Sequence, residues 1–385
     1  MRKTKLNRRS FLRTGSMGAL AVPLINFNRF HFFADQALPY STRAVDLVNS
    51  SLVIDMLSLL DMTRFFTAPA QGEDPLKFSA AELQNIKASG IDIFHPAVGL
   101  GGTGVREASL QFFGAYNGLV AEHPEYLMRI DSAADLEKIR TSDKMGIILG
   151  LQNSDHFEQV ADVKRFYQLG QRISQLTYNT QNRIASGSTD RIDGGISDYG
   201  ARIVAAMNEV GMVVDVSHCG DRTTLDAFEL STQPVLITHS NCRALAPGHP
   251  RCKTDEAITK MAAQGGVMGI TAVRNFVSNS EPTTLDSYID HIDHVVRLTG
   301  IEHVGIGTDA DLNGYDDLPP AINKSLRAGY KDSYAFREKI DIEGMDHPKK
   351  MYDLTEGLIR RGYSDEHIRL ILGGNFARAL AAIWG

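Results

Sequence analysis

Two histidines follow consecutive apolar runs and give the clearest chemical signal in the sequence. His218 ends the run VVDVSHCG, and His239 ends the run VLITHSNCRAL, 21 residues later. One histidine at the end of a strand is more often a hydrogen-bonded structural residue, but neighbouring strands lie about 5 Å apart, so two imidazoles can share one divalent ion. Asp309 ends a third run, GIGTDAD, and its carboxylate is suited to orienting or deprotonating water. Together these residues predict metal-assisted hydrolysis.

Polar residues also end the other apolar runs. They are Asp55, His95, Gln152, Tyr178 with Asn179, and Arg274. In barrel enzymes the carboxyl ends of the strands gather at one face, so these residues are expected to form a polar ring. Within the ring we expect Gln152 or Asp55 to supply a further metal ligand and Asn179 to contact substrate. Asp55 lies one layer deeper, where its alternative role is hydrogen bonding beneath the site.

Eight apolar runs, most of them rich in β-branched residues, are expected to position this ring. They begin at Ser51, Gly90, Met145, Ile173, Met212, Pro234, Gly266 and His303. Amphipathic helical patterns lie between them, for example from Asp198 and from Thr284. Eight strands alternating with helices predict an α/β fold, a closed (β/α)8 TIM barrel. An open doubly wound sheet is the alternative, but no glycine-rich phosphate loop follows the first run.

The first 36 residues predict an export signal. Arg8 and Arg9 stand in RRSFLR ahead of a short apolar stretch, which is typical of twin-arginine signals and too short to span a bilayer. A basic surface arm is the alternative. We therefore expect residues 1–36 to be a signal peptide and linker, and residues 37–385 to be a single barrel domain. The protein would use the twin-arginine export machinery and reside in the periplasm or the cell envelope.

Charge and cysteine content restrict the partners and the covalent structure. Residues 1–36 carry seven basic residues and one acidic residue, a net charge of +6. Because the whole chain has a net charge of −6, residues 37–385 have a net charge of −12. An acidic domain without a basic stripe argues against nucleic acid as a partner. The three cysteines cannot form a disulfide framework, although one bridge between Cys242 and Cys252 stays open in an oxidising compartment.

Several motifs resemble those of the membrane (renal) dipeptidases. They are VVDVSHCGDRT, PVLITHSNCRALAPGHPR, HIDHVVRLTGIEHVGIGTDAD and LILGGNFARAL, and they occur in the family's order. The resemblance extends from about Ser51 to the C-terminus and is densest after Tyr199. It implies a zinc hydrolase on an amidohydrolase-type barrel, and it leaves a homodimer open because many members of that family are dimers.

The resemblance also implies roles for individual residues. Members of that family hold two zinc ions, and the ligands that end strands five and six correspond to His218 and His239. The arginine that binds the terminal carboxylate of a dipeptide corresponds to Arg251 in GHPRC. The aspartate that directs the attacking water corresponds to Asp309.

The sequence departs from the family at four positions. The first-strand motif, IDGHND in the family, reads IDMLSL here, so Leu57 and Leu59 occupy the positions of two ligands. The bridging glutamate corresponds to Gln152, and a histidine that stabilises the oxyanion corresponds to Tyr178, whose hydroxyl can still donate a hydrogen bond. Leucine cannot bind zinc, and an amide poorly replaces a bridging carboxylate. We therefore expect the second family site to be absent and one divalent metal, zinc, to be held by the two histidines.

Two functions from different classes are compatible with these residues. The first is an exported metallodipeptidase that cleaves dipeptides or a related small amide with metal-activated water. The second is a repurposed or catalytically inactive barrel that binds a small molecule or acts in the maturation of an exported peptide natural product. The lost ligand positions motivate the second function, and the retained histidines and Asp309 motivate the first.

Overall fold

The computed structural model describes residues 40–61, 64, 74 and 76–385. Residues Arg43–Gly385 form one compact unit. The predicted signal segment, residues 1–36, and its boundary at residue 37 lie outside the described residues. Within the described residues, no helix is both long enough and apolar enough to cross a membrane.

Each of the eight predicted strands is present. The third predicted strand is divided at Ile148 into β4 and β5, and one short strand, β3, was not predicted. The strands are β1 (Ile54–Asp55), β2 (Ile93–Phe94), β3 (Leu127–Arg129), β4 (Met145–Ile147), β5 (Leu149–Leu151), β6 (Gln171–Gln175), β7 (Val213–Asp215), β8 (Ile237–Ser240), β9 (Met268–Ile270) and β10 (Val304–Ile306).

Parallel pairing joins these strands into a ring. The strand order is β1-β2-β4-β3 in one sheet, β5-β6-β7 in a second and β10-β9-β8 in a third, and every pair is parallel. The Leu236 amide donates to the Val214 carbonyl at 3.0 Å and joins β7 to β8. The Met56 amide donates to the Ile306 carbonyl at 3.0 Å and joins β1 to β10. The fold is the predicted (β/α)8 TIM barrel, with β3 as an added strand beside β4.

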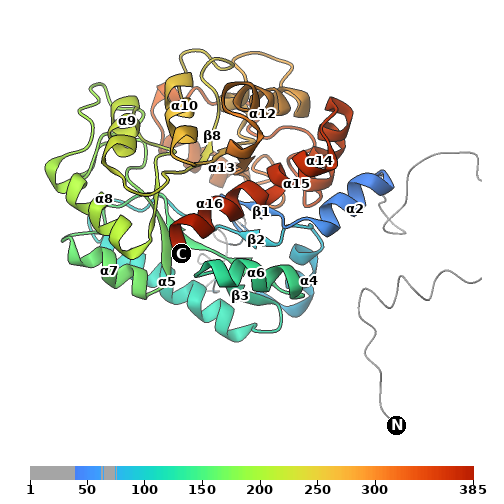
Figure 1. Ribbon diagram of the computed structural model, residues 1–385, viewed down its shortest axis with the longest axis horizontal. Helices are drawn as coiled ribbons and strands as arrows, with labels where there is room; N and C mark the ends of the chain where they lie inside the picture. Colours follow the sequence, from blue (N-terminus) through green and yellow to red (C-terminus); the bar gives the residue numbers. More distant parts are fainter. Residues whose placement is uncertain (1–39, 62–63, 65–73, 75) are drawn as a thin grey trace, which may run out of the picture. The chain divides into compact units, whose positions relative to one another are not determined.

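Helices surround the ring of strands (Figure 1). The two helices predicted from periodicity are confirmed as α8 and α12. The helices are α2 (Thr42–Ser50), α4 (Ala80–Lys87), α5 (Val105–Glu122), α6 (Ala133–Thr141), α7 (Ala161–Gln168), α8 (Asp198–Val210), α9 (Asp221–Leu230), α10 (Asp255–Ala263), α11 (Arg274–Val277), α12 (Leu285–Thr299), α13 (Pro320–Ala328), α14 (Lys350–Arg361), α15 (Asp365–Arg369) and α16 (Asn375–Trp384). Shorter helical turns are η2 (Ile301–His303), η3 (Asp332–Tyr334) and η4 (Leu370–Gly374).

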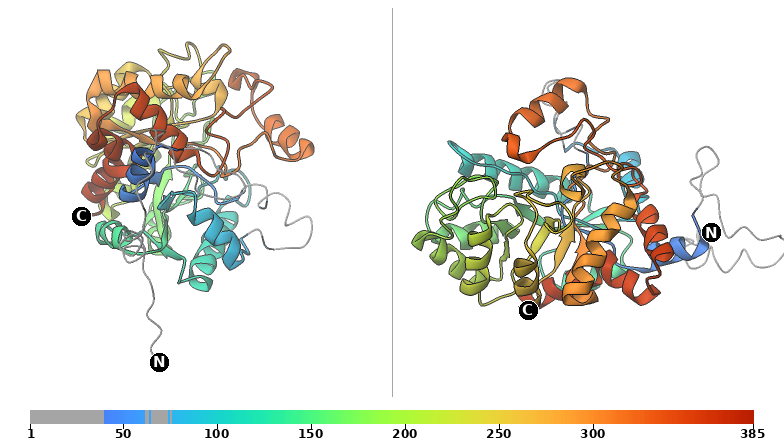
Figure 2. Two further views of the ribbon diagram at one scale, coloured as in Figure 1. Left: turned by 90° about the vertical axis from the view of Figure 1, so that its right-hand side faces the viewer. Right: turned by 90° about the horizontal axis from the view of Figure 1, so that it is seen from above.

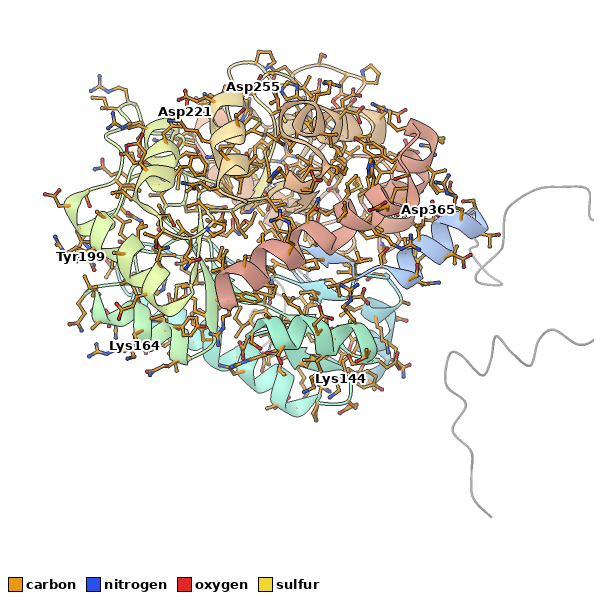
Figure 3. The ribbon with its side chains drawn as sticks, viewed as in Figure 1. Lys144, Lys164, Tyr199, Asp221, Asp255 and Asp365 are labelled. Atoms are coloured by element: carbon orange, nitrogen blue, oxygen red, sulfur yellow. The ribbon has the colours of Figure 1, made fainter. Side chains whose placement is uncertain are left out.

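Acidic residues begin several of the surrounding helices. Asp221, Asp255 and Asp365 stand in the first turns of α9, α10 and α15, and Figure 3 shows them at the outside of the molecule. A negative charge at this end of a helix is stabilised by the helix dipole, typically by about 0.3–1 kcal/mol. These carboxylates therefore fix helix starts and lie apart from the barrel interior.

The last helix closes the amino-terminal end of the barrel. Phe376, Leu380 and Ile383 of α16 pack against residues from the beginnings of strands, including Val213 and Val267. Figure 1 shows α16 lying across the centre of the ring. Because this end is filled by apolar side chains, the opposite, carboxyl end is left for the functional site.

A long segment after β10 covers part of that opposite end. Residues 310–345 contain α13 and η3, and Figure 2 shows α13, in orange-red, standing out from the other helices. Tyr315, Tyr334 and Ile340 of this segment pack with Val273 and Phe276 in an apolar cluster. This long segment after the eighth barrel strand is thus an aromatic cover over the carboxyl face.

Candidate metal centre and active site

The two predicted metal-ligand histidines meet inside the barrel. His218 lies just beyond β7 and His239 lies in β8, and both are buried. Their Nε2 atoms are 3.0 Å apart, and their ring centroids are 5.0 Å apart. Two nitrogens on one tetrahedral zinc ion are separated by about 3.3 Å, given zinc–nitrogen distances of about 2.0–2.1 Å. The spacing of the pair therefore matches a shared ion closely.

The other ring nitrogens determine the tautomers of both histidines. His218 Nδ1 lies 2.7 Å from Asn179 Oδ1, which can only accept, so Nδ1 carries the proton. His239 Nδ1 lies 2.8 Å from the Thr238 hydroxyl, which in turn donates to Asp215 at 2.6 Å. His239 therefore also carries its proton on Nδ1. In the neutral rings both Nε2 lone pairs face each other, an arrangement that a cation between them stabilises.

Burial keeps both rings neutral. The loss of hydration lowers the pKa of His218 and of His239 well below the usual value, and the nearby Arg251 cation lowers both further. A proton is thus a poor occupant for the space between the two Nε2 atoms. Neutral imidazoles with bare Nε2 atoms are the form that binds a divalent metal, so the donor set fits the ion that the sequence predicts.

The buried side-chain oxygen of Gln152, which is predicted as a further ligand, has no hydrogen-bond partner within the described structure. The Nε2 of Gln152 donates to the Ala97 carbonyl at 2.9 Å. Among the described residues, no group of three or more His, Cys, Asp or Glu side chains is arranged to hold a metal ion. A centre at His218 and His239 would therefore rely on a neutral donor such as this amide, or on water, for its remaining ligands.

His95 is a further buried histidine that the sequence placed in the polar ring without a role. Its Nδ1 donates to the Met56 carbonyl at 2.7 Å, and its Nε2 is buried without a partner. Burial lowers the pKa of His95 from its usual value, so the ring is neutral. A Cβ atom at Gly150 would lie 2.3 Å from His95 Nε2, so the glycine provides the space for this ring. The signal in the sequence was a histidine directly after one apolar run and a glycine within the next.

Asp309 stands at the carboxyl end of β10, at the mouth of the barrel. It adopts a left-handed backbone conformation with φ of 51°, which is uncommon for a residue other than glycine. The Tyr315 hydroxyl donates to its carbonyl at 2.7 Å. Burial raises the pKa of the Asp309 carboxyl to about 7, although Arg251 acts in the opposite direction. A carboxyl with this pKa can exchange protons at neutral pH.

Tyr178 and Asn179 occupy the end of the fourth barrel strand. The Tyr178 ring stacks on His218 with centroids 4.3 Å apart, and its hydroxyl lies 2.6 Å from the Tyr330 hydroxyl. Asn179 also has a left-handed conformation, with φ of 61°, and orients His218. The amide oxygen of Asn179 is thus engaged by the histidine. Its predicted role in substrate binding stays a prediction.

Arg251 lies beside the two histidines and does not line the cavity described below. It is fully buried and donates to the carbonyls of Ser217 and His239, the latter at 3.2 Å. Its Nε has no hydrogen-bond partner in the described structure. The predicted contact with a substrate carboxylate stays a prediction, while the observed contacts fix the backbone next to both metal-ligand candidates.

Asp55, predicted either as a further metal ligand or as a hydrogen-bonding residue beneath the site, is fully buried. Its carboxylate accepts hydrogen bonds from the Thr308 amide at 2.8 Å, the Thr308 hydroxyl at 2.6 Å and the Leu57 amide at 3.3 Å. Burial raises the pKa of Asp55, although Lys350 acts in the opposite direction. These hydrogen bonds tie β1 to β10, and they leave Asp55 a structural role in this geometry.

The three cysteines are free and buried. Cys219 follows His218 directly, yet its sulfur receives a hydrogen bond from the Thr177 hydroxyl at 3.4 Å. Cys242 and Cys252, for which a bridge was left open, are unpaired in this structure. Burial raises the pKa of all three thiols, so none is a ready thiolate ligand.

A cavity of about 240 Å³ opens beside Gln152, Tyr178 and Asp309. Leu57 and Leu59, which are predicted to stand at two altered ligand positions, also line this cavity. Most of the remaining lining comes from the second barrel strand, from the segment after β9 and from the cover after β10: Ala97, Val98, Gly99, Val273, Phe276, Tyr315, Leu326, Tyr330, Tyr334, Phe336 and Ile340. Asp309, the candidate acid–base residue, therefore shares this cavity with an apolar, largely aromatic lining.

Comparison with known proteins assigns the chain to a family. Residues 44–327 match the model of the membrane dipeptidase family, Peptidase family M19. Dipeptidase verJ of Clonostachys rogersoniana is 28% identical over 279 residues, which are 72% of this chain and 65% of the relative. An uncharacterized dipeptidase of Schizosaccharomyces pombe is 32% identical over 201 residues, which are 50% of this chain and 48% of the relative. The matches thus span less than two thirds of each of these relatives.

Solved structures agree with this assignment. The crystal structure of an amidohydrolase from Pseudomonas aeruginosa is 29% identical and superposes with a TM-score of 0.75, covering 89% of this chain and 99% of that one. The family match covers most of the barrel, from α2 to α13. By these similarities in sequence and fold, the chain belongs to the membrane dipeptidase family, Peptidase family M19.

Proposed function

We propose that this protein is an exported hydrolase that cleaves dipeptides or a related small amide with the help of one divalent metal ion, zinc. The observation that carries the proposal is the pair of His218 and His239, whose bare Nε2 atoms face each other at 3.0 Å. Membership of a dipeptidase family supports the class of reaction. Export rests on the twin-arginine pattern of residues 1–36, and the protein would act in the periplasm or cell envelope.

The residues of the chain divide the chemistry between them. When bound, a divalent ion supplies Lewis acidity, which makes water a better nucleophile at neutral pH. Asp309 accepts a proton from the attacking water, which its pKa of about 7 permits, and returns it to the leaving amine. The Tyr178 hydroxyl donates a hydrogen bond to the developing oxyanion, once its hydrogen bond with the Tyr330 hydroxyl is broken.

Other residues position this machinery. Asn179 and Thr238 hold the two histidines in the tautomer that exposes Nε2. Arg251 supports the carbonyls next to the histidines and adds positive charge to the site. By electrostatic attraction, this charge also favours a substrate that ends in a carboxylate, which is the role that the family resemblance implies for Arg251.

Metal content and hydrolysis together test the proposal. The full chain, purified without chelator, should contain about one equivalent of zinc, manganese or iron and should release amino acids from a panel of dipeptides. Asp309→Asn should abolish most turnover, whereas exposed Asp317→Asn, from the same loop, should leave it intact. Metal below about a tenth of an equivalent, with no cleavage after metal addition, would refute the hydrolase proposal.

A second candidate function is a barrel that binds small molecules without turnover or serves the maturation of an exported peptide natural product. The presence of Leu57 and Leu59 in the lining of the cavity favours it, because these side chains cannot bind metal. Ligand binding to the purified protein with no hydrolysis of any dipeptide, metal added or not, would select this function over the first.

A further inference from the structure

The cavity beside Asp309 has an apolar surface because most of its phenol groups are already engaged. The Tyr315 hydroxyl donates to the Asp309 carbonyl at 2.7 Å, and the hydroxyls of Tyr178 and Tyr330 pair at 2.6 Å. These rings therefore present mainly their carbon faces to a ligand, together with Leu57, Leu59 and Leu326.

The charges around the cavity disfavour an anionic group inside it. Among the described residues that line the cavity, Asp309 is the only Asp, Glu, Lys, Arg or His, so no cationic side chain lines it to pair with a carboxylate. Arg251, the nearby buried cation, is absent from the lining and donates to backbone carbonyls. A carboxylate placed there would lose its hydration without gaining an ion pair, which is costly.

The size of the cavity points to a single side chain. Pockets for drug-sized ligands usually enclose about 300–1,000 Å³, whereas this cavity encloses about 240 Å³. Aromatic residues such as Phe276, Tyr334 and Phe336 surround it from several directions. Aromatic pairs prefer edge-to-face or offset contacts, and Phe276 and Tyr334 already adopt an edge-to-face contact at 5.3 Å, so another ring fits this environment better than a flexible polar chain.

From these observations, we propose that the cavity binds an uncharged aromatic side chain of the substrate, and that Leu57, Leu59 and Leu326 determine this specificity. The proposal rests on the proposed function for its choice of an amino-acid derivative as the ligand. It assigns a use to the altered first strand, because side chains at the two positions that lost metal ligands form part of the specificity wall. The substrate carboxylate, where present, lies outside this cavity.

Binding measured without turnover tests the proposal. Isothermal titration calorimetry of the full chain would compare three probes of one design: N-acetyl-L-phenylalaninamide, N-acetyl-L-alaninamide and the negatively charged amide of N-acetyl-L-glutamate. We expect the phenylalanine probe to bind at least about tenfold more tightly than the other two. Leu59→Asp and, independently, Leu326→Asp should each remove this preference by adding a charge to the wall.

A matched control separates the wall from a general effect of added charge. Leu110 is exposed on α5 and does not line the cavity, so Leu110→Asp should retain the preference for the phenylalanine probe. Equal binding of the phenylalanine and alanine probes, or an unchanged preference in both wall variants, would overturn the proposal. Absence of dipeptide cleavage would instead overturn the proposed function and leave the binding result valid.

Discussion

Asp309→Asn should increase the free energy of unfolding above neutral pH while removing hydrolytic activity. Burial raises the pKa of this carboxyl from 3.8 to about 7 in the folded protein. The folded state therefore holds a proton that the unfolded state has already released, and ionising Asp309 inside the fold costs free energy. Asparagine keeps the shape of the side chain and cannot ionise, so it avoids this cost.

The magnitude follows from the pKa difference. About three pH units at about 1.4 kcal/mol each give an upper limit of about 4 kcal/mol. Asp309 is only half-buried, and solvent screening should reduce the measured value to about 2 kcal/mol. As far as Asp309 is concerned, the folded state has its full stability relative to the unfolded state below about pH 4, where this carboxyl is protonated in both. The free energy of unfolding then falls as the pH rises towards 7. The variant should therefore match the wild type near pH 4, gain between pH 4 and 7, and keep a constant advantage above pH 7.

Urea denaturation at pH 4, 5, 6, 7 and 8 measures this difference. A chelator should be present, because a bound cation would favour the ionised carboxylate and mask the effect. Asp317→Asn, an exposed change in the same loop, is the matched control and should show no such pH-dependent gain. If Asp309→Asn is equally stable at all pH values relative to the wild type, or less stable at pH 8, the assignment of a raised pKa to Asp309 is wrong.

The remaining predictions concern the residues around Asp309. Asn179→Leu removes the hydrogen-bond acceptor of a metal-ligand candidate and should lower zinc affinity by about 10–100-fold in a competitive chelator titration. Tyr178→Phe should lower kcat by about a hundredfold with little change in KM, and an unchanged kcat would remove its hydroxyl from the mechanism. Gly150→Ala should destabilise the protein by about 1–3 kcal/mol in urea denaturation, because the new methyl group collides with His95. Gly114→Ala, where the helix surface is open, should be neutral or stabilising.

The barrel could be predicted from the sequence because each strand carries its own local signal. All eight strands arise from short apolar runs, and residues at the carboxyl ends of such runs must share one face of the barrel. The interruption at Ile148 and the short β3 were missed, since both depend on pairing with a neighbour rather than on apolar pattern. The meeting of His218 and His239 followed from strand adjacency alone.

The finer geometry of the site could not be predicted because it depends on contacts between distant residues. Asn179 and His218 are 39 residues apart, and Tyr178 and Tyr330 are 152 residues apart. Residues 310–345 carry many charges in the sequence, and only the fold shows that tyrosines of this segment pack inward over the barrel. Arg251 illustrates the same limit, because burial and its two carbonyl partners are properties of the packed structure.

Beside the Asp55 carboxylate, two backbone hydrogen bonds join the first and last barrel strands. The Met56 amide donates to Ile306 and the Asp309 amide donates to Leu57, whatever side chain residue 57 bears. The side chain of residue 57 can therefore be replaced without loss of the backbone hydrogen bonds that join β1 to β10. Substitution of the side chain at position 57 would therefore change the chemistry of this mouth while the hydrogen bonds of the scaffold persist.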